Sequence, residues 1–146
     1  MAKGDKLYYK SLRLAYLKKP DHKTIYSLLI RSSELQNDKA QYALATWYIH
    51  GKYVEKDYKK AFHFLLLSSK KNNSFAFYDL AVCYETGKGV KINKRQAFLN
   101  YLSAALLGNK QSIYEVGRCY YYGIGVNKNL DVAQRWLNAA KYWGVK

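Results

Sequence analysis

Proline is nearly absent from this sequence: Pro20 is the single instance among 146 residues. Since proline interrupts helices, its scarcity favours long, unbroken helices. Cysteine is scarce as well, and its two instances, Cys83 and Cys119, stand 36 residues apart. That spacing resembles neither a metal site nor a disulfide framework. We therefore expect reduced packing residues and no metal or cofactor, with a disulfide between repeats as the less favoured alternative.

Long hydrophobic runs are also missing. The aliphatic run Leu65–Leu67 is only three residues long, far too short to cross a bilayer. The charged start, Met1–Lys6, is not followed by the apolar segment of a signal peptide. The sequence thus predicts no membrane span and a cytoplasmic protein, with export by a route that needs no N-terminal signal left open.

Acidic residues are few, ten Asp and Glu against 25 Lys and Arg. No Ser-His-Asp arrangement or pair of carboxylates recurs, and His22, His50 and His63 are not spaced as metal ligands. A catalytic site depends on such groups, so we expect no enzyme and no catalytic residue.

The resulting net charge of +15 favours acidic partners: nucleic acid, an anionic membrane surface or an acidic protein face. The charge is spread along the chain, with +5 over residues 1–39, +4 over 40–75, +3 over 76–111 and +3 over 112–146. A nucleic-acid-binding protein more often concentrates its charge in one stripe. We therefore rank an acidic protein partner above nucleic acid, and a solvated basic surface without a role remains an alternative.

The most informative pattern is a repeat of 36 residues. Four sets of residues keep this period without any insertion: Tyr48, Tyr84 and Tyr120; Gly51, Gly87 and Gly123; Val54, Val90 and Val126; Ala61, Ala97 and Ala133. A period of this size indicates a repeat array, in which each unit buries its apolar face against its neighbours. We assign the repeats to residues 40–75, 76–111 and 112–146 of a single domain.

Each repeat reads as a helix, a loop and a second helix, with no strand signal. Apolar residues recur at helical spacing beside a position that is small in every repeat: Ala45, Ala81 and Gly117. Glycine then ends the first helix, and Asp57, Asn93 and Asn129 are suitable N-caps for the second. The segment Gly123–Val126 superficially suggests a phosphate loop, but such loops follow strands, so a helix stop is the better interpretation.

This pattern resembles the Sel-one-like repeat, a relative of the tetratricopeptide repeat. The resemblance covers about residues 40–146 and is strongest in the third repeat, at Tyr120, Gly123, Gly125, Val126, Ala133, Trp136, Ala139, Ala140 and Gly144. The first repeat departs from it: Tyr53 stands where the second glycine belongs, so we expect a differently shaped loop. The resemblance implies an all-α superhelical solenoid that acts as an adaptor or scaffold, with no catalytic residues.

Residues 1–39 fit the same frame more loosely. Asp21 is a plausible cap for a helix through Ile25, Leu28 and Leu29. We interpret this segment as a degenerate N-terminal capping hairpin, which solenoids need to cover an open end. An unrelated helical hairpin is the less favoured alternative.

If the first helices line a concave face, their varied positions form a surface for a partner. The candidates are Trp47, His50, Asp79, Thr86, Glu115, Arg118 and Tyr122. Trp47 and Tyr122 are the expected anchors, because aromatic residues are enriched among interface hot spots. The alternative is that Trp47, Cys83 and Cys119, which share one register, pack between neighbouring helices.

A second candidate contact is the C-terminal end, where Tyr121, Tyr142 and Trp143 are expected to be partly exposed and covered by a second copy or by the partner. The leading functional hypothesis is a protein-interaction adaptor that binds a polypeptide on the concave face. A narrower version is a dedicated toxin-neutralising protein or an effector. The alternative is a basic protein that binds nucleic acid or an anionic surface.

Overall fold

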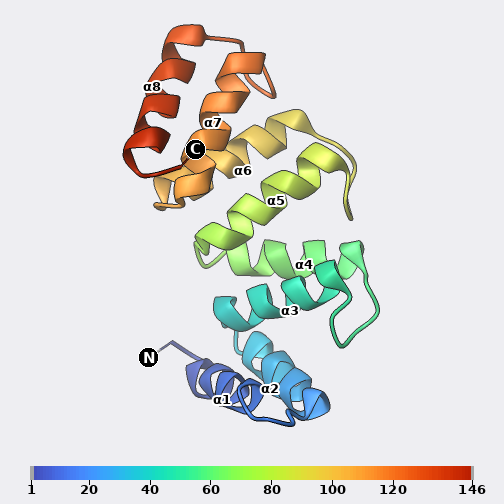
Figure 1. Ribbon diagram of the computed structural model, residues 1–146. Coiled ribbons are helices and arrows are strands. Elements are labelled where there is room, and N and C mark those ends of the chain that lie inside the picture. The colour runs from blue at the N-terminus through green and yellow to red at the C-terminus, as the bar shows by residue number, and fades with distance from the viewer. Residues whose placement is uncertain (1, 146) are drawn as a thin grey trace. The chain divides into compact units, whose positions relative to one another are not determined.

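The computed structural model describes residues 2–145, and within them all regular structure is helical. The helices are α1 (Asp5–Ala15), α2 (His22–Glu34), α3 (Asp38–His50), α4 (Tyr58–Ser69), α5 (Ser74–Thr86), α6 (Lys94–Leu106), α7 (Lys110–Tyr122) and α8 (Leu130–Tyr142). They form two compact units, residues 1–73 with α1–α4 and residues 74–146 with α5–α8. Each unit contains two antiparallel hairpins (Figure 1).

In the first unit, α2 packs against α1 and α3, and α3 packs against α4. Its core is made of small and branched side chains at helical spacing, among them Ile25, Leu29, Ala40 and Leu44. Asn37 ties the start of the chain to this core: its side chain caps α3 at Ala40 N and donates to Asp5 Oδ1 at 2.8 Å. The segment before residue 39 is therefore a helical hairpin that packs on the first repeat.

In the second unit, α6 packs against α5 and α7, and α7 packs against α8. Its core is richer in aromatic residues, with Phe98 and Tyr101 packed beside Val116 and Cys119. Gly117 of α7 is buried, and a Cβ atom there would lie 2.9 Å from the side chain of Leu137 on α8. The small residue predicted at this register thus lets two helices approach closely.

The predicted helix ends are confirmed. Gly51 and Gly123 are the C-caps of α3 and α7, with left-handed φ angles of 63° and 71°. The side chains of Asp57, Asn93 and Asn129 each accept a hydrogen bond from the backbone N–H three residues later. These local signals explain why the helix bounds follow the repeat period.

Candidate partner-binding site

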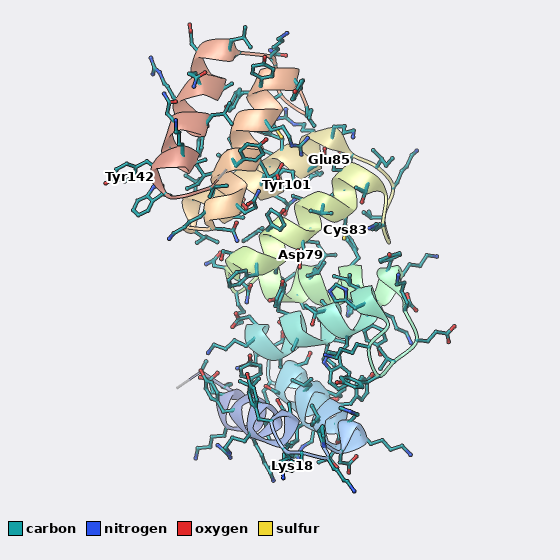
Figure 2. The ribbon with its side chains drawn as sticks, viewed as in Figure 1. Lys18, Asp79, Cys83, Glu85, Tyr101 and Tyr142 are labelled. Carbon is teal, nitrogen blue, oxygen red and sulfur yellow. The ribbon has the colours of Figure 1, made fainter. Side chains whose placement is uncertain are left out.

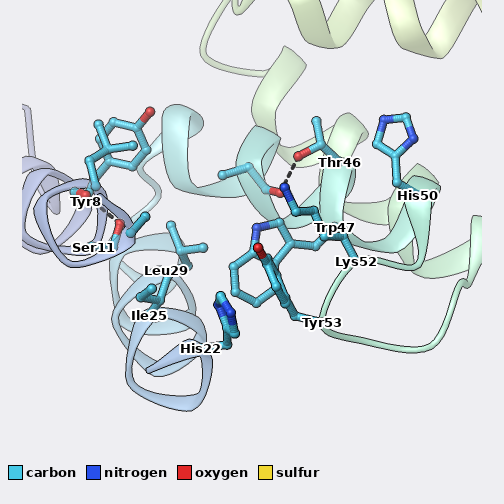
Figure 3. Close-up of a pocket in the computed structure, with 13 residues that line it drawn as sticks. Tyr8, Ser11, His22, Ile25, Leu29, Thr46, Trp47, His50, Lys52 and Tyr53 are labelled. Carbon is cyan, nitrogen blue, oxygen red and sulfur yellow. Dashed lines mark hydrogen bonds between the residues drawn. The ribbon is translucent and has the colours of Figure 1, made fainter. Parts of the chain in front are cut away.

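The first unit contains a cavity of about 360 Å³ between α1, α2, α3 and the loop that follows α3 (Figure 3). We call it the α1–α3 groove. The positions of α3 that the sequence predicted to face a partner line it, and α1 and α2 complete its walls. The lining residues are Tyr8, Ser11, Leu12, Ala15, His22, Ile25, Leu29, Ala43, Thr46, Trp47, His50, Lys52 and Tyr53.

Two of the candidates, Trp47 and His50, both line the groove. Trp47 is half-buried in the groove, and its ring lies 5.1 Å from the Tyr53 ring and 5.9 Å from the Tyr26 ring. His50 is exposed one turn further along α3. Cys83 and Cys119, which share the register of Trp47, are buried, as the packing alternative expects. Trp47 also packs against the core of the first unit, and it lines the groove as well.

Tyr53 is a lining residue that sequence reasoning noted only as a departure from the repeat. It adopts a left-handed φ of 66°, close to the 74° of Gly89 and the 67° of Gly125 in the later repeats. The expectation of a differently shaped loop is thus wrong for the backbone conformation at this position. A tyrosine in this region is strained, because its Cβ meets the neighbouring backbone.

The two units differ in how closely this loop approaches the start of the second helix of the preceding hairpin, which is α2 in the first unit and α6 in the second. A Cβ atom at Gly125 would overlap the carbonyl oxygen of Lys94. Tyr53 stands 31 residues after His22, as Gly125 stands 31 residues after Lys94. In the first unit the Tyr53 ring stacks on the His22 ring, with centroids 3.5 Å apart. In the first unit the Tyr53 side chain therefore lies between the loop and α2, whereas in the second unit the loop backbone at Gly125 lies directly against α6.

The polar groups of the groove are basic or hydroxylic. Lys52, His22 and His50 line it, and no carboxylate does. Lys52 Nζ lies 5.3 Å from the centre of the Tyr53 ring, a cation–π distance. The hydroxyl of Thr46 donates to the Ala43 carbonyl at 2.7 Å, so it is turned towards its own helix.

In the second unit, α5 and α7 correspond to α1 and α3, and charged hydrogen bonds join them. Arg118 of α7 donates from two nitrogens to Glu85 of α5, at 2.8 and 3.0 Å, and from Nε to Glu115 at 2.6 Å. Tyr101 on α6 donates its hydroxyl to Glu85 at 2.9 Å. Thr46 holds the register of Arg118 in the first repeat, so a small side chain faces the groove where the second unit has an ion pair. The candidates Glu115 and Arg118 are therefore paired with residues of their own unit.

This network fixes the protonation states of its members. Burial opposes ionisation of Glu85, but the hydrogen bonds from Arg118 and Tyr101 outweigh it and hold the pKa of Glu85 below its usual value. The hydrogen bonds to Glu85 raise the pKa of Arg118 above its usual value, so the guanidinium stays charged.

Burial raises the pKa of both Cys83 and Cys119 to about 11. Neither thiol is therefore an activated nucleophile near neutral pH.

The remaining candidates lie apart from the groove. Asp79 is half-buried on α5, one helical turn before Cys83 (Figure 2). Thr86 is exposed and donates its hydroxyl to the Val82 carbonyl, and Tyr122 is 67% exposed at the end of α7. At the end of α8, Tyr142 is 82% and Trp143 54% exposed, and Trp143 lies near Lys110 at the start of α7. Tyr121 is 46% exposed but lies at the opposite end of α7, so the structure does not bring it together with the other two. Their cover by another chain remains a prediction.

No group of three or more His, Cys, Asp and Glu side chains in residues 2–145 is placed to hold a metal ion. No described helix has the length and apolar character needed to cross a membrane.

Several solved structures resemble the chain, among them the following three. A protective antigen of uropathogenic Escherichia coli with an SLR fold is 24% identical at a TM-score of 0.92, over 98% of this chain and 31% of that one. A Sel1 repeat protein from Oxalobacter formigenes is 24% identical at a TM-score of 0.89, over 98% and 42%. Helicobacter pylori cysteine rich protein B is 25% identical at a TM-score of 0.67, over 76% and 84%. The chain thus spans less than half the length of the first two, and the likeness confirms the predicted all-α class of helix–loop–helix repeats.

No curated protein sequence matches the chain. The family model of the Sel1 repeat matches residues 38–73, 74–109 and 110–142, two residues out of phase with the repeats assigned from the sequence. Sel1 repeat proteins generally mediate protein–protein interactions, and they are typically scaffolds without enzymatic activity. These three matched repeats cover most of the 146 residues, and the chain belongs to the Sel1 repeat family.

Proposed function

We propose that this protein is an adaptor that binds a polypeptide in the α1–α3 groove of its first unit. The observation that carries this proposal is the half-buried Trp47 beside an open cavity of about 360 Å³. Ligand pockets in proteins span about 300–1,000 Å³, so the groove is large enough to hold one or two side chains of a partner. Tryptophan is also among the residues most enriched at interface hot spots.

The second unit supports the same role in another way. Its Glu85–Arg118–Glu115 network holds α5 and α7 together, because charge-assisted hydrogen bonds fix the geometry of the groups they join. Thr86 and Tyr122 are exposed on that unit and are the positions at which we expect additional partner contacts. Glu115, Arg118 and Asp79 would then shape the surface around them.

Site-specific photo-crosslinking tests the proposal. A benzophenone side chain at His50, on the groove, should form an adduct with one specific protein in the source cell. The same group at Gln134, which is exposed on α8, is the matched control and should not form that adduct. Adding Trp47→Ala should abolish the adduct from position 50. Absence of any protein adduct from position 50 would contradict the proposal.

The narrower versions, a toxin-neutralising protein or an effector that acts on another organism's protein, are proposals about the identity of the partner. The genes beside the coding sequence distinguish them: a toxin gene supports the first, and genes of a secretion system support the second. Retention in the cytoplasm is expected for the neutralising version.

Nucleic-acid or anionic-surface binding is the second candidate function. It is favoured by the net charge of +15 and by exposed basic residues near the starts of α4, α6 and α8: Lys59, Lys60, Lys94, Arg95 and Lys128. Such binding weakens steeply with salt, because each neutralised phosphate releases counterions. A gel-shift assay with DNA and RNA at physiological salt tests it, and an unretarded probe would remove this candidate.

A further inference from the structure

We propose that the α1–α3 groove takes an acidic peptide segment with one apolar side chain inserted beside Trp47, and that Tyr53 is its specificity-determining residue. This inference rests on the proposed adaptor function and narrows it to a class of partner. Three independent features support it: the charge of the groove, the composition of its walls and the unfavourable local state of Tyr53.

Lys52 is the charged side chain that lines the groove, and the first unit around it is basic overall. The first unit carries fifteen Lys and Arg against six Asp and Glu. Four of the six carboxylates are engaged by their own unit: Asp5 by Asn37 and Lys39, Asp21 and Asp57 by helix N-termini, and Asp38 by Asn73. Lys52, His22 and His50 line the groove without a carboxylate. An acidic segment therefore complements this surface, and a basic one is repelled.

The walls of the groove are apolar. Trp47 of α3 and Leu12 of α1 line it together with Ile25 and Leu29 of α2, whose side chains are buried. Figure 3 shows Ile25 and Leu29 pointing into the space between Tyr8 and Trp47. A side chain entering this space contacts aromatic and aliphatic carbon, while Lys52 and His50 meet the charged groups beside it. An acidic segment with an aromatic or branched aliphatic residue meets both requirements.

Tyr53 is held in an unfavourable local state at the same wall. Its φ of 66° is a conformation that glycine adopts freely and tyrosine does not. The His22 ring on which it stacks has a buried Nδ1 atom with no hydrogen-bond partner among the described residues. Strained backbone and unsatisfied polar atoms gather at functional sites, where other interactions retain them. The later repeats have Gly89 and Gly125 at this register, so the fold does not need tyrosine here.

Selection of peptides by the full chain tests this inference. A random peptide library displayed on phage should yield peptides rich in Asp and Glu around one aromatic or aliphatic residue. A fluorescent copy of the best peptide should lose about tenfold or more in affinity on Trp47→Ala and on Tyr53→Gly. Tyr16→Ala, an 87% exposed aromatic outside the groove, should leave the affinity unchanged.

A role of Tyr53 in binding can be separated from a role in folding by measuring affinity and stability in the same variants. Glycine suits the left-handed backbone, so Tyr53→Gly should keep the circular dichroism spectrum and the melting temperature while affinity falls. Tyr53→Asn provides a second variant, since asparagine also tolerates this conformation and limits loop flexibility. Unchanged affinity in both variants would overturn the assignment of Tyr53.

Several outcomes would overturn the choice of an acidic peptide. These are the selection of neutral or basic peptides, a failure to select any peptide, and an affinity of Trp47→Ala for the peptide equal to that of the wild type. A fourth is that poly-uridylate RNA displaces the peptide equally well whether or not the peptide carries its apolar residue. The adaptor function is tested separately by the crosslink from position 50. If a protein adduct forms but its crosslinked segment lacks acidic residues, the adaptor function stands and this inference is overturned. If no adduct forms, the adaptor function itself is overturned.

Discussion

Gly123 and Gly125 lie two residues apart in the last loop, yet they are glycine for different reasons. At Gly123 a Cβ atom would sit 3.4 Å from the Lys128 side chain, an ordinary contact, so only the left-handed φ of 71° disfavours other residues. At Gly125 the backbone itself leaves no room, because the Lys94 carbonyl oxygen occupies the place of a Cβ.

Replacing Gly123 by Val should lower the free energy of unfolding by about 1–3 kcal/mol, since a β-branched residue is poorly tolerated at positive φ. Urea denaturation followed by circular dichroism measures the change. An unaltered midpoint would mean that the helix stop does not depend on the glycine conformation.

Gly125→Ala should destabilise the chain more than Gly123→Ala, although both add one methyl group at a positive φ. The added methyl at position 125 must displace the loop from α6, whereas at position 123 it fits. Comparison of the two unfolding midpoints checks this order. Equal midpoints would show that the loop yields without cost.

At the scale of helices, the second unit is joined by a polar network across α5, α6 and α7. Glu85 is its centre, because it accepts hydrogen bonds from both Arg118 and Tyr101. Its side chain is 16% exposed, so solvent only partly screens the interaction. Breaking such a partly buried charged contact removes more stability than breaking a surface pair.

Glu85→Gln should reduce the free energy of unfolding by about 1–3 kcal/mol at neutral pH, the usual value for hydrogen bonds to charged groups. Because the folded chain lowers the pKa of Glu85, the carboxylate stabilises the fold above its ordinary pKa of 4.5, and this contribution is lost as pH falls through the lowered value. The difference in unfolding free energy between wild type and Glu85→Gln should therefore be constant above the ordinary pKa and shrink as the pH falls below it towards the lowered value. Denaturation from neutral pH to about pH 3 measures it, and a difference that stays constant with pH would contradict the ion pair.

Helices and their ends were predictable from the sequence because their causes are local. Asp57, Asn93 and Asn129 cap helices that begin within the next residues, and Gly51 and Gly123 end helices that directly precede them. The assigned repeats and the family matches consequently differ by only two residues in phase.

The content of the candidate site was only partly predictable, because it depends on pairs that are distant in sequence. Trp47 and His50 were identified from the varied positions of one helix. The pairing of Arg118 with Glu85 spans 33 residues and follows no repeated residue type, since Ile49 and Tyr121 hold the register of Glu85. Tyr53 carried a usable signal, a tyrosine at a glycine register, but its contact with His22 required the structure.

For the whole molecule, the all-α repeat architecture is the property that the sequence predicted best, while a single superhelical domain remains a prediction. The partner is less constrained, because it depends on side chains that differ among repeats at equivalent positions. Exposed aromatic residues are the clearest signal at this scale. Tyr142 points outward at the end of α8 (Figure 2), next to Trp143, whose ring lies 5.3 Å away.

These aromatic residues lead to the prediction of self-association. Tyr142 and Trp143 are each more than half exposed, and exposed aromatic groups of this kind tend to mark contact surfaces. Lys110 Nζ lies 5.6 Å from the centre of the Trp143 ring, a cation–π distance, so this surface combines apolar and cationic groups. We expect the mass measured by light scattering to rise with protein concentration, and Tyr142→Ala with Trp143→Ala to suppress the rise. Tyr16→Ala, in the first unit, is the matched control, because it removes an equally exposed ring elsewhere. A monomer mass at every concentration would exclude a second copy and leave the partner protein as the expected cover for this surface.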